Sequence, residues 1–174
     1  HWTDSPQSAV RTASDTLLQS IDLAVAAEEL GADGAYFRVH HFARQLASPF
    51  PLLAAIGART SRIEIGTGVI DMRYENPLYM AEDAGAADLI SGGRLQLGIS
   101  RGSPEQVIDG WRYFGYGPKE GQSDADMGRQ HAEIFLELGV YEDDVLEAWY
   151  QLNKTGHSAW YARQQRAAEA QETT

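Results

Sequence analysis

Cysteine is absent from this sequence of 174 residues. Its absence excludes disulfide bonds, thiolate metal sites and a cysteine nucleophile. Basic side chains are few: 14 Lys and Arg stand against 25 Asp and Glu, which gives a formal net charge of −11. Because nucleic-acid binding needs a basic surface that neutralises phosphates, this balance argues against a nucleic-acid partner.

Long apolar runs are lacking as well. No stretch approaches the about 20 apolar residues that cross a bilayer, and no basic-then-apolar leader opens the chain. We therefore expect a cytoplasmic protein with no membrane partner. An apolar content of 43% at this length is nevertheless sufficient for one domain with a buried core.

The motifs of several common catalytic sites are also missing. The sequence has no HExxH motif and no P-loop. Gly66-Thr-Gly68 lacks the third glycine and the following helix of a dinucleotide-binding loop. Ser103 is not surrounded by Gly-x-Ser-x-Gly, so a helix cap explains it better than a nucleophile does. We expect no metal site.

Strands and helices alternate along the first hundred residues. Apolar residues at helical spacing predict the first helix, and short apolar runs predict strands. The expected elements are a helix over 14–30, a strand over 35–39, a helix over 48–58, a strand over 62–70, a helix over 76–90 and a strand over 95–99. Residues 1–13 are expected to form a loop and residues 162–174 a frayed tail.

Helix-opening pairs recur at regular intervals. They are Ser48-Pro49, Asn76-Pro77 and Ser103-Pro104, spaced by 28 and 27 residues. That spacing is one strand–helix unit each time, and such alternation implies a parallel sheet with helices packed on it. About three to four such units are visible. An open doubly wound sheet and a (β/α) barrel both fit this pattern.

The pattern weakens after Gln106. The four aromatic residues between 111 and 116 stand in a glycine-rich loop and are expected to be core or lid rather than a stacking site. Asp124 or Asp126 can cap a further helix that carries Phe135. Because no strand is visible after Ser100, a complete barrel of about 250 residues is not expected.

Polar residues follow the expected strands at the edge where α/β folds bind ligands. His40 and His41 follow the strand over 35–39. Adjacent strand residues point to opposite faces, so one of them can enter a ligand site while the other packs. Histidine there suits proton transfer, although a hydrogen-bonded structural histidine also fits the spacing.

Two further polar positions lie on the next units. Arg101 separates a strand end from the helix start at Ser103 and suits an anion or an electron-rich ring; a surface Arg paired with an acid fits equally. Glu82 lies inside a helix, where charges are usually solvated, but it can also reach back to hold Arg101. Gly66 and Gly68 leave room for something to approach the backbone.

Together these segments resemble the bacterial luciferase-like monooxygenase family. The resemblance spans roughly residues 30–116. It is carried in order by Glu29–Gly34, Val39–Phe42, Arg62–Val69, Asn76-Pro77 with Ala81–Asp83, and Gly93–Gly102. The order and spacing of these motifs are the specific feature. The family has an acid before the two histidines, where this sequence has Val39.

The resemblance implies an α/β fold of the (β/α)₈ TIM-barrel type that binds reduced flavin at its carboxyl face. The flavin is usually FMN, and some relatives use a deazaflavin. The chain would be a partial luciferase-like domain over 1–174, acting as a monooxygenase with reduced FMN and O₂ on a small organic substrate. Alternatives are a reduced non-catalytic or partner subunit and a deazaflavin-dependent dehydrogenase. Open strand edges would favour a homo- or hetero-oligomer.

The resemblance also implies roles for particular residues. His40 would be the active-site residue near the flavin, with His41 beside it. The strand end at Gly68, Val69 and Ile70 would pack against the isoalloxazine ring, often with a non-proline cis peptide. The remaining cofactor-binding residues would be Glu82, Ser100, Arg101 and Gly102. The family's phosphate-binding loops come from later strands, and none is recognisable after about Glu137.

Overall fold

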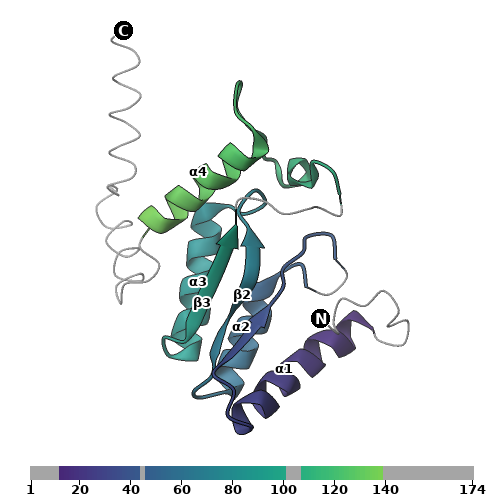
Figure 1. Cartoon of the computed structure of the whole chain (residues 1–174), viewed down its shortest axis with the longest axis vertical. Coiled ribbons are helices and arrows are strands. Elements are labelled where there is room, and N and C mark those ends of the chain that lie inside the picture. Colours follow the sequence, from purple (N-terminus) through teal and green to yellow (C-terminus); the bar gives the residue numbers. More distant parts are fainter. Residues whose placement is uncertain (1–11, 44–45, 101–106, 139–174) are drawn as a thin grey trace.

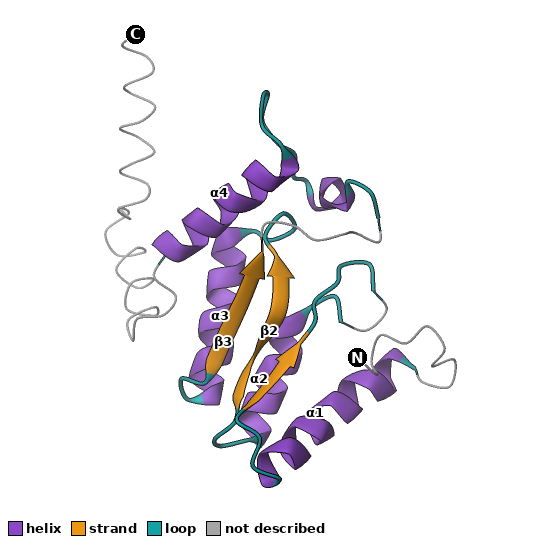
Figure 2. Cartoon of the chain, in the orientation of Figure 1, coloured by secondary structure: helices purple, strands orange, loops and turns teal. Residues whose placement is uncertain are grey.

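The computed structural model describes residues 12–43, 46–100 and 107–138. Its elements, in order, are α1 (Ala13–Glu29), β1 (Gly34–Phe37), α2 (Pro49–Arg59), β2 (Glu64–Asp71), α3 (Pro77–Ser91), β3 (Leu95–Ser100), the 3₁₀ helix η2 (Gly110–Phe114) and α4 (Asp124–Glu137). The predicted alternation is confirmed (Figures 1 and 2). Helix α1 starts one residue early, with Thr12 as its N-cap. Residues 1–11 of the expected loop and the expected tail over 162–174 lie outside the described residues.

The sheet is parallel throughout, with the strand order β1-β2-β3. In its register, Phe37 lies opposite Thr67 and Asp71 lies opposite Ser100. All three strands therefore end at one edge, here named the carboxyl edge. Strand β1 ends at Phe37 rather than at residue 39, because the chain leaves the pairing with β2 there. Helices α2 and α3 lie behind the sheet in Figure 2.

Local signals place the helix starts. Pro49 and Pro77 each occupy the first turn of a helix, where the missing N–H has no partner to lose. The Asn76 side chain accepts hydrogen bonds from the first backbone N–H groups of α3. Gly92, with φ of 74°, ends that helix in a left-handed conformation that glycine adopts without strain. The predicted helix boundaries at 49 and 77 are confirmed.

The core lies between the sheet and its helices. Ile63, Ile65 and Ile70 of the β2 segment are fully buried against Leu53 and Ile56 of α2. Phe135 of α4 is 1% exposed and joins the same cluster, so the predicted apolar side of that helix is confirmed at this residue. No helix in the described ranges is long and apolar enough to cross a membrane.

Close packing of β2 on β3 explains one glycine. A Cβ on Gly66 would lie 1.9 Å from the carbonyl oxygen of Gln96, so β3 itself fills the space beside Gly66. Gly68 differs, because the nearest atom to its Cβ position would be Cβ of Tyr36 at 3.7 Å. Of the two glycines expected to leave room beside the backbone, only Gly68 keeps that room open.

Polar contacts close the opposite, amino edge of the sheet. The Glu28 carboxylate accepts hydrogen bonds from the backbone N–H groups of Ser61, Arg62 and Ile63 at 2.7–3.1 Å. These donors favour the charged carboxylate and lower the pKa of Glu28 to about 2. The end of α1 is thereby joined to the start of β2.

A second clamp at the amino edge uses one guanidinium. Arg94 donates to oxygen atoms of Gly57, Thr60, Ile63 and Ser91 at 2.6–2.9 Å. Its five N–H groups are all used, and the acceptors are carbonyl and hydroxyl oxygens rather than carboxylates. The end of α2 and the start of β3 are therefore held by geometry that a lysine could not reproduce.

Replacing Glu28 tests the first clamp. We expect Glu28→Gln to lower the melting temperature by a few degrees at pH 7, because the amide loses the charge that its backbone donors stabilise. The pKa of Glu28 is lower in the folded chain than its ordinary 4.5, so this contribution is present above about pH 4.5 and is lost as the pH falls towards 2. Thermal unfolding followed by circular dichroism across that range measures the difference.

Glu29→Gln is the matched control, since Glu29 is the exposed neighbour of Glu28. It removes the same charge without a backbone clamp, and its melting temperature should stay near that of the unaltered chain. Equal losses in the two variants at pH 7 would contradict the clamp.

Candidate active site

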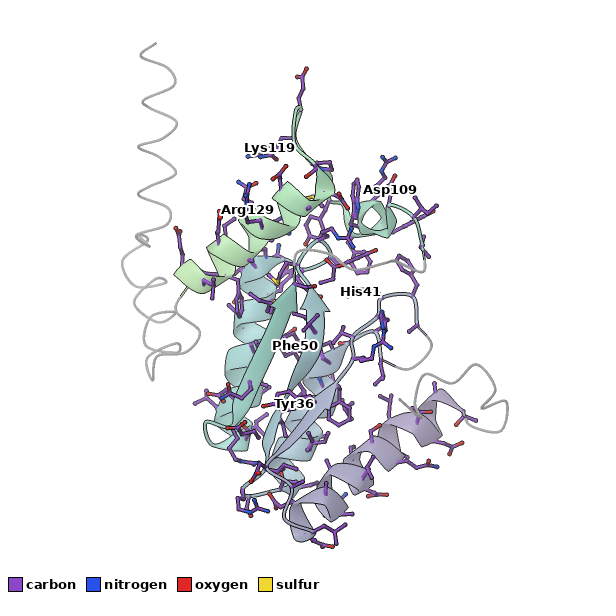
Figure 3. All side chains as sticks on the ribbon, in the orientation of Figure 1. Tyr36, His41, Phe50, Asp109, Lys119 and Arg129 are labelled. Atoms are coloured by element: carbon purple, nitrogen blue, oxygen red, sulfur yellow. The ribbon has the colours of Figure 1, made fainter. Side chains whose placement is uncertain are left out.

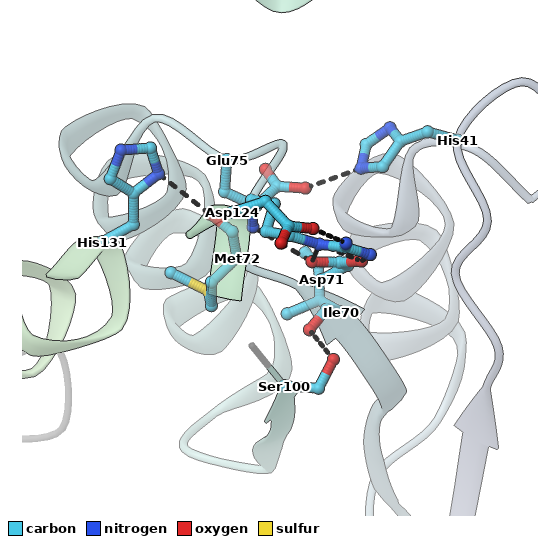
Figure 4. A network of polar contacts seen from close by, with 9 residues as sticks. His41, Ile70, Asp71, Met72, Glu75, Ser100, Asp124 and His131 are labelled. Atoms are coloured by element: carbon cyan, nitrogen blue, oxygen red, sulfur yellow. Dashed lines mark hydrogen bonds and ion pairs between the residues drawn. The ribbon is translucent and has the colours of Figure 1, made fainter. Parts of the chain in front are cut away.

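One of the two histidines is held by a carboxylate from the neighbouring strand's loop. His41 Nε2 lies 3.0 Å from Oε1 of Glu75, and the two side chains are 12% and 16% exposed (Figure 4). The His41 ring stacks on Tyr74 at 4.6 Å and meets the edge of Phe114 at 5.0 Å. His41 thus ties the loop after β1 to the loop after β2 and to η2.

His40 has a different environment. It is half-buried, its backbone N–H donates to the Leu46 carbonyl at 3.0 Å, and its own carbonyl accepts from the Ala43 N–H at 3.1 Å. No residue of the described segments forms a hydrogen bond with its imidazole. His41 is therefore in packing, but because β1 ends at Phe37, the alternation of strand residues does not account for the difference between the two histidines. The role of His40 beside a flavin stays a prediction, as does a cofactor contact for His41.

The end of β2 carries the predicted ring-facing segment. The Gly68–Val69 peptide bond is cis, as the resemblance implied. Gly68 is exposed and the Val69 side chain is 42% exposed, so both are accessible. Ile70 is not: its side chain is fully buried in the core. The helices cover the Ile70 side chain, and a cofactor contact of this residue stays a prediction.

The end of β3 is joined to the end of β2. Ser100 is half-buried, its hydroxyl donates to the Ile70 carbonyl at 3.3 Å, and its carbonyl accepts from the Met72 N–H at 2.9 Å. Arg101 and Gly102, both predicted to contact the cofactor, lie outside the described residues. Glu82 lies exposed on α3, and its support of Arg101 stays a prediction.

The segment after β3 departs from one expectation. A helix was predicted to begin at Ser103, which lies outside the described residues. From Val107 to Asp109 the chain forms a bend and a turn, followed by η2. The expected helix therefore does not extend past residue 106. Within η2 the aromatic residues divide: Trp111 is buried, whereas Tyr113 and Phe114 are exposed. Figure 3 shows Asp109 beside η2, towards the carboxyl edge.

A buried ion network supports this edge. Arg73 is 7% exposed and binds both carboxylate oxygens of Asp71 through Nε and Nη2, at 2.7–3.2 Å. Its Nη1 also binds the carboxylate of Asp124 at the start of α4 (Figure 4). His131 of α4 contacts the Met72 carbonyl through Nδ1 at 2.9 Å. Helix α4 is thereby fixed to the loop after β2.

Sequence reasoning missed these supporting residues. Asp71, Arg73 and Glu75 follow an apolar strand directly, at the same edge as the two histidines. Charged residues in that position were a usable signal for a polar site. Asp124 was recognised only as a possible helix cap; the cap is Ser123, and Asp124 binds Arg73 instead.

The described part of this edge is acidic. Burial raises the pKa of the Asp83 carboxyl, and the negative charges of Glu82 and Glu75 raise it further. Arg73 is balanced by two carboxylates. Within the segments that the structure describes, the edge therefore suits an uncharged ring system better than a phosphate group.

Comparison with known proteins shows the family to which this chain belongs. The family model described as luciferase-like monooxygenase matches residues 2–134. The protein YwcH of Bacillus subtilis is 31% identical over 82% of this chain and 41% of its own length. The 4-hydroxyprotoasukamycin monooxygenase of Streptomyces nodosus is 31% identical over 68% of this chain and 30% of its own. The chain thus spans about a third to two-fifths of these two relatives.

A solved structure shows the same fold. The oxygenating constituent of 3,6-diketocamphane monooxygenase from Pseudomonas putida, in complex with FMN, matches 74% of this chain and 35% of its own, with a TM-score of 0.62 and 24% identity. The expected fold class, an α/β chain with part of a TIM-type barrel, is confirmed by this likeness and by the parallel sheet.

Removal of the buried guanidinium tests the network that supports the edge. We expect Arg73→Met to destabilise the chain by about 3–5 kcal/mol, because the carboxylate of Asp71 then remains buried without a counter-charge. Urea unfolding measures the change.

Arg129→Met is the control, since Arg129 also contacts two acids, Asp126 and Glu133, but is 57% exposed. Exposed pairs of this kind contribute about 0–1 kcal/mol. If both variants cost the same, the carboxyl edge does not depend on Arg73.

Proposed function

The chain belongs to the luciferase-like monooxygenase family, and from that premise we propose that it provides the ring-binding side of a flavin-dependent monooxygenase. The proposed reaction uses reduced FMN and O₂ on a small organic substrate. Since the chain spans a third to two-fifths of the relatives described above, the activity of the whole protein is part of this proposal.

The accessible Gly68–Val69 step is the observation that carries the proposal. It lies at the carboxyl edge, where parallel α/β folds bind ligands, and Gly68 presents bare backbone with no side chain. A planar ring can approach such a surface closely, and the exposed Val69 side chain offers an apolar contact to it. The residues present therefore fit the isoalloxazine ring of a flavin.

Reduced flavin, when bound, supplies the activation of O₂, and the chain supplies position and proton transfer. His40 is the proposed proton donor or acceptor, since the residue is half-buried and no described residue forms a hydrogen bond with its imidazole. His41 is assigned to positioning: its bond to Glu75 fixes the loop from which His40 extends. Ser100 holds the end of β3 against β2, beside the proposed ring position.

The phosphate side of the cofactor needs other groups. The described part of the edge is acidic, so Arg101 and Gly102 keep their proposed role as phosphate-side contacts, with Glu82 supporting Arg101. Later strands of a longer chain or a partner subunit would add the remaining contacts. Self-association through the strand edges stays a prediction.

FMN titration tests the proposal. We expect this chain to quench FMN fluorescence on binding, and Gly68→Val to weaken that binding about 10-fold or more, because a side chain then stands where the ring packs. The added Cβ meets only Tyr36 at an ordinary 3.7 Å, so the fold should tolerate it. His40→Ala should lower the rate at which O₂ reoxidises reduced FMN bound to an excess of the chain, measured without a reductase, while leaving the fold intact.

Gly117→Val is the matched control. A Cβ on Gly117 likewise meets a single side chain at 3.7 Å, that of Trp111, and Gly117 is not part of the proposed ring-facing step. FMN binding that responds equally to both substitutions, or to neither, would refute the ring position. Binding of FMN that leaves its reoxidation by O₂ as fast as in free solution and insensitive to His40→Ala would favour the non-catalytic subunit. Binding of a deazaflavin in place of FMN would favour the dehydrogenase.

A further inference from the structure

Aromatic rings from three separate segments meet at the carboxyl edge. Phe42 comes from the loop after β1, Tyr74 from the loop after β2, and Tyr113 and Phe114 from η2. We name these four residues the ring cluster. Phe42 meets Tyr113 at 6.0 Å and Phe114 at 5.9 Å, and Tyr74 meets Phe114 at 5.4 Å, all edge to face. These separations lie in the range that aromatic pairs prefer.

Three of these rings face solvent. Phe42 and Phe114 are each 43% exposed and Tyr113 is 79% exposed, whereas Tyr74 is 6% exposed. Tyr74 packs with Trp111 and Met127 in a buried cluster separate from the main core. The ring cluster therefore combines one buried ring with three exposed rings, so it presents an aromatic surface to solvent and is not a closed core.

Two backbone features accompany the ring cluster: positive φ angles at two non-glycine residues, and a glycine at position 110. Phe42 and Asp109 are the two non-glycine residues with positive φ in the described segments, at 64° and 51°. Phe42 belongs to the cluster, and Asp109 directly precedes Gly110, which lies against it. Gly110 permits the contact, because a Cβ there would lie 2.6 Å from the Phe42 ring and 3.0 Å from the Tyr74 hydroxyl. Non-glycine residues adopt this conformation at a cost, and such positions gather at functional sites.

We propose that the ring cluster binds the aromatic ring of a neutral small-molecule substrate. Rings arranged edge to face leave a position that a further ring can fill in the same pattern. The carboxylates of Glu75, Glu82 and Asp83 influence one another and disfavour a carboxylate or phosphate ester. The guanidinium of Arg112, next to Tyr113, is already paired with Asp109. The ligand class is therefore aromatic and uncharged.

The position of the cluster connects it with the proposed chemistry. His41 stacks on Tyr74 and contacts Phe114, and it directly follows His40 in the chain. A ring held by the cluster thus lies beside the loop that carries the proposed proton-transfer residue. The assignment of this ligand as the substrate rests on the proposed function; the binding surface itself does not.

Binding of 2-naphthol to the 174-residue chain tests the inference. Calorimetric titration of the flavin-free protein is compared with the same titration of cyclohexylmethanol, an apolar alcohol without an aromatic ring. We expect saturable binding of 2-naphthol, weaker binding of cyclohexylmethanol, and a loss of about 5- to 10-fold in 2-naphthol affinity for Tyr113→Ser. Because Tyr113 is mostly exposed, this variant should fold normally.

Tyr79→Ser is the matched control, since Tyr79 is 68% exposed on α3 and forms no ring pair with the residues described. Its affinity for 2-naphthol should change less than 2-fold. A second variant, Phe114→Leu, keeps the apolar volume but removes a ring and should also weaken binding.

Three results would overturn the inference: no saturable 2-naphthol binding, equal affinity for cyclohexylmethanol, or equal losses in Tyr113→Ser and Tyr79→Ser. Light scattering tests whether a second copy of the chain packs on the rings. In that case Tyr113→Ser would convert a dimer to a monomer. FMN titration separates this inference from the proposed function. Binding of FMN without binding of 2-naphthol refutes only the ring cluster as a binding surface. Binding of 2-naphthol without binding of FMN supports the binding surface and refutes its role in the oxygenation.

Discussion

The buried guanidinium of Arg73 is the interaction on which the carboxyl edge depends. It joins the end of β2, through Asp71, to the start of α4, through Asp124. The residues that follow Arg73 in the chain are Tyr74 and Glu75, so fixing Arg73 also fixes the floor of the ring cluster and the carboxylate that holds His41. Water and salt screen a buried ion pair much less than a surface pair. The ion pairs of Arg73 can therefore hold the loop after β2 in place.

The two edges of the sheet are built differently, and the difference suits their roles. At the amino edge, Glu28 and Arg94 form hydrogen bonds with backbone groups of the neighbouring segments. Such an edge stabilises the fold and offers a ligand few free groups. The carboxyl edge has exposed rings, a half-buried histidine and accessible backbone at Gly68. In (β/α) folds this division between a stabilising edge and a functional edge is the general rule.

The candidate site was predictable in location but not in its supporting residues. The histidine pair and the Gly68–Val69 step stand at strand ends, and a strand end can be recognised from apolar patterning and helix starts. Glu75 was not recognised, because its partner His41 lies 34 residues away and nothing local marks the pair. The burial of the Ile70 side chain was not predictable for a related reason: a run of strand residues does not show which of them the helices cover.

Local rules therefore determined the order of the elements and the edge at which the candidate site lies. Proline and asparagine at helix starts, glycine at a helix end and apolar runs between them act over a few residues, so they can be read without the fold. Tertiary structure alone decided that His41 packs on Tyr74, that β3 fills the space at Gly66, and that Asp124 reaches Arg73 across 51 residues. These outcomes depend on strand register and on the approach of distant segments, and no pattern of neighbouring residues encodes either.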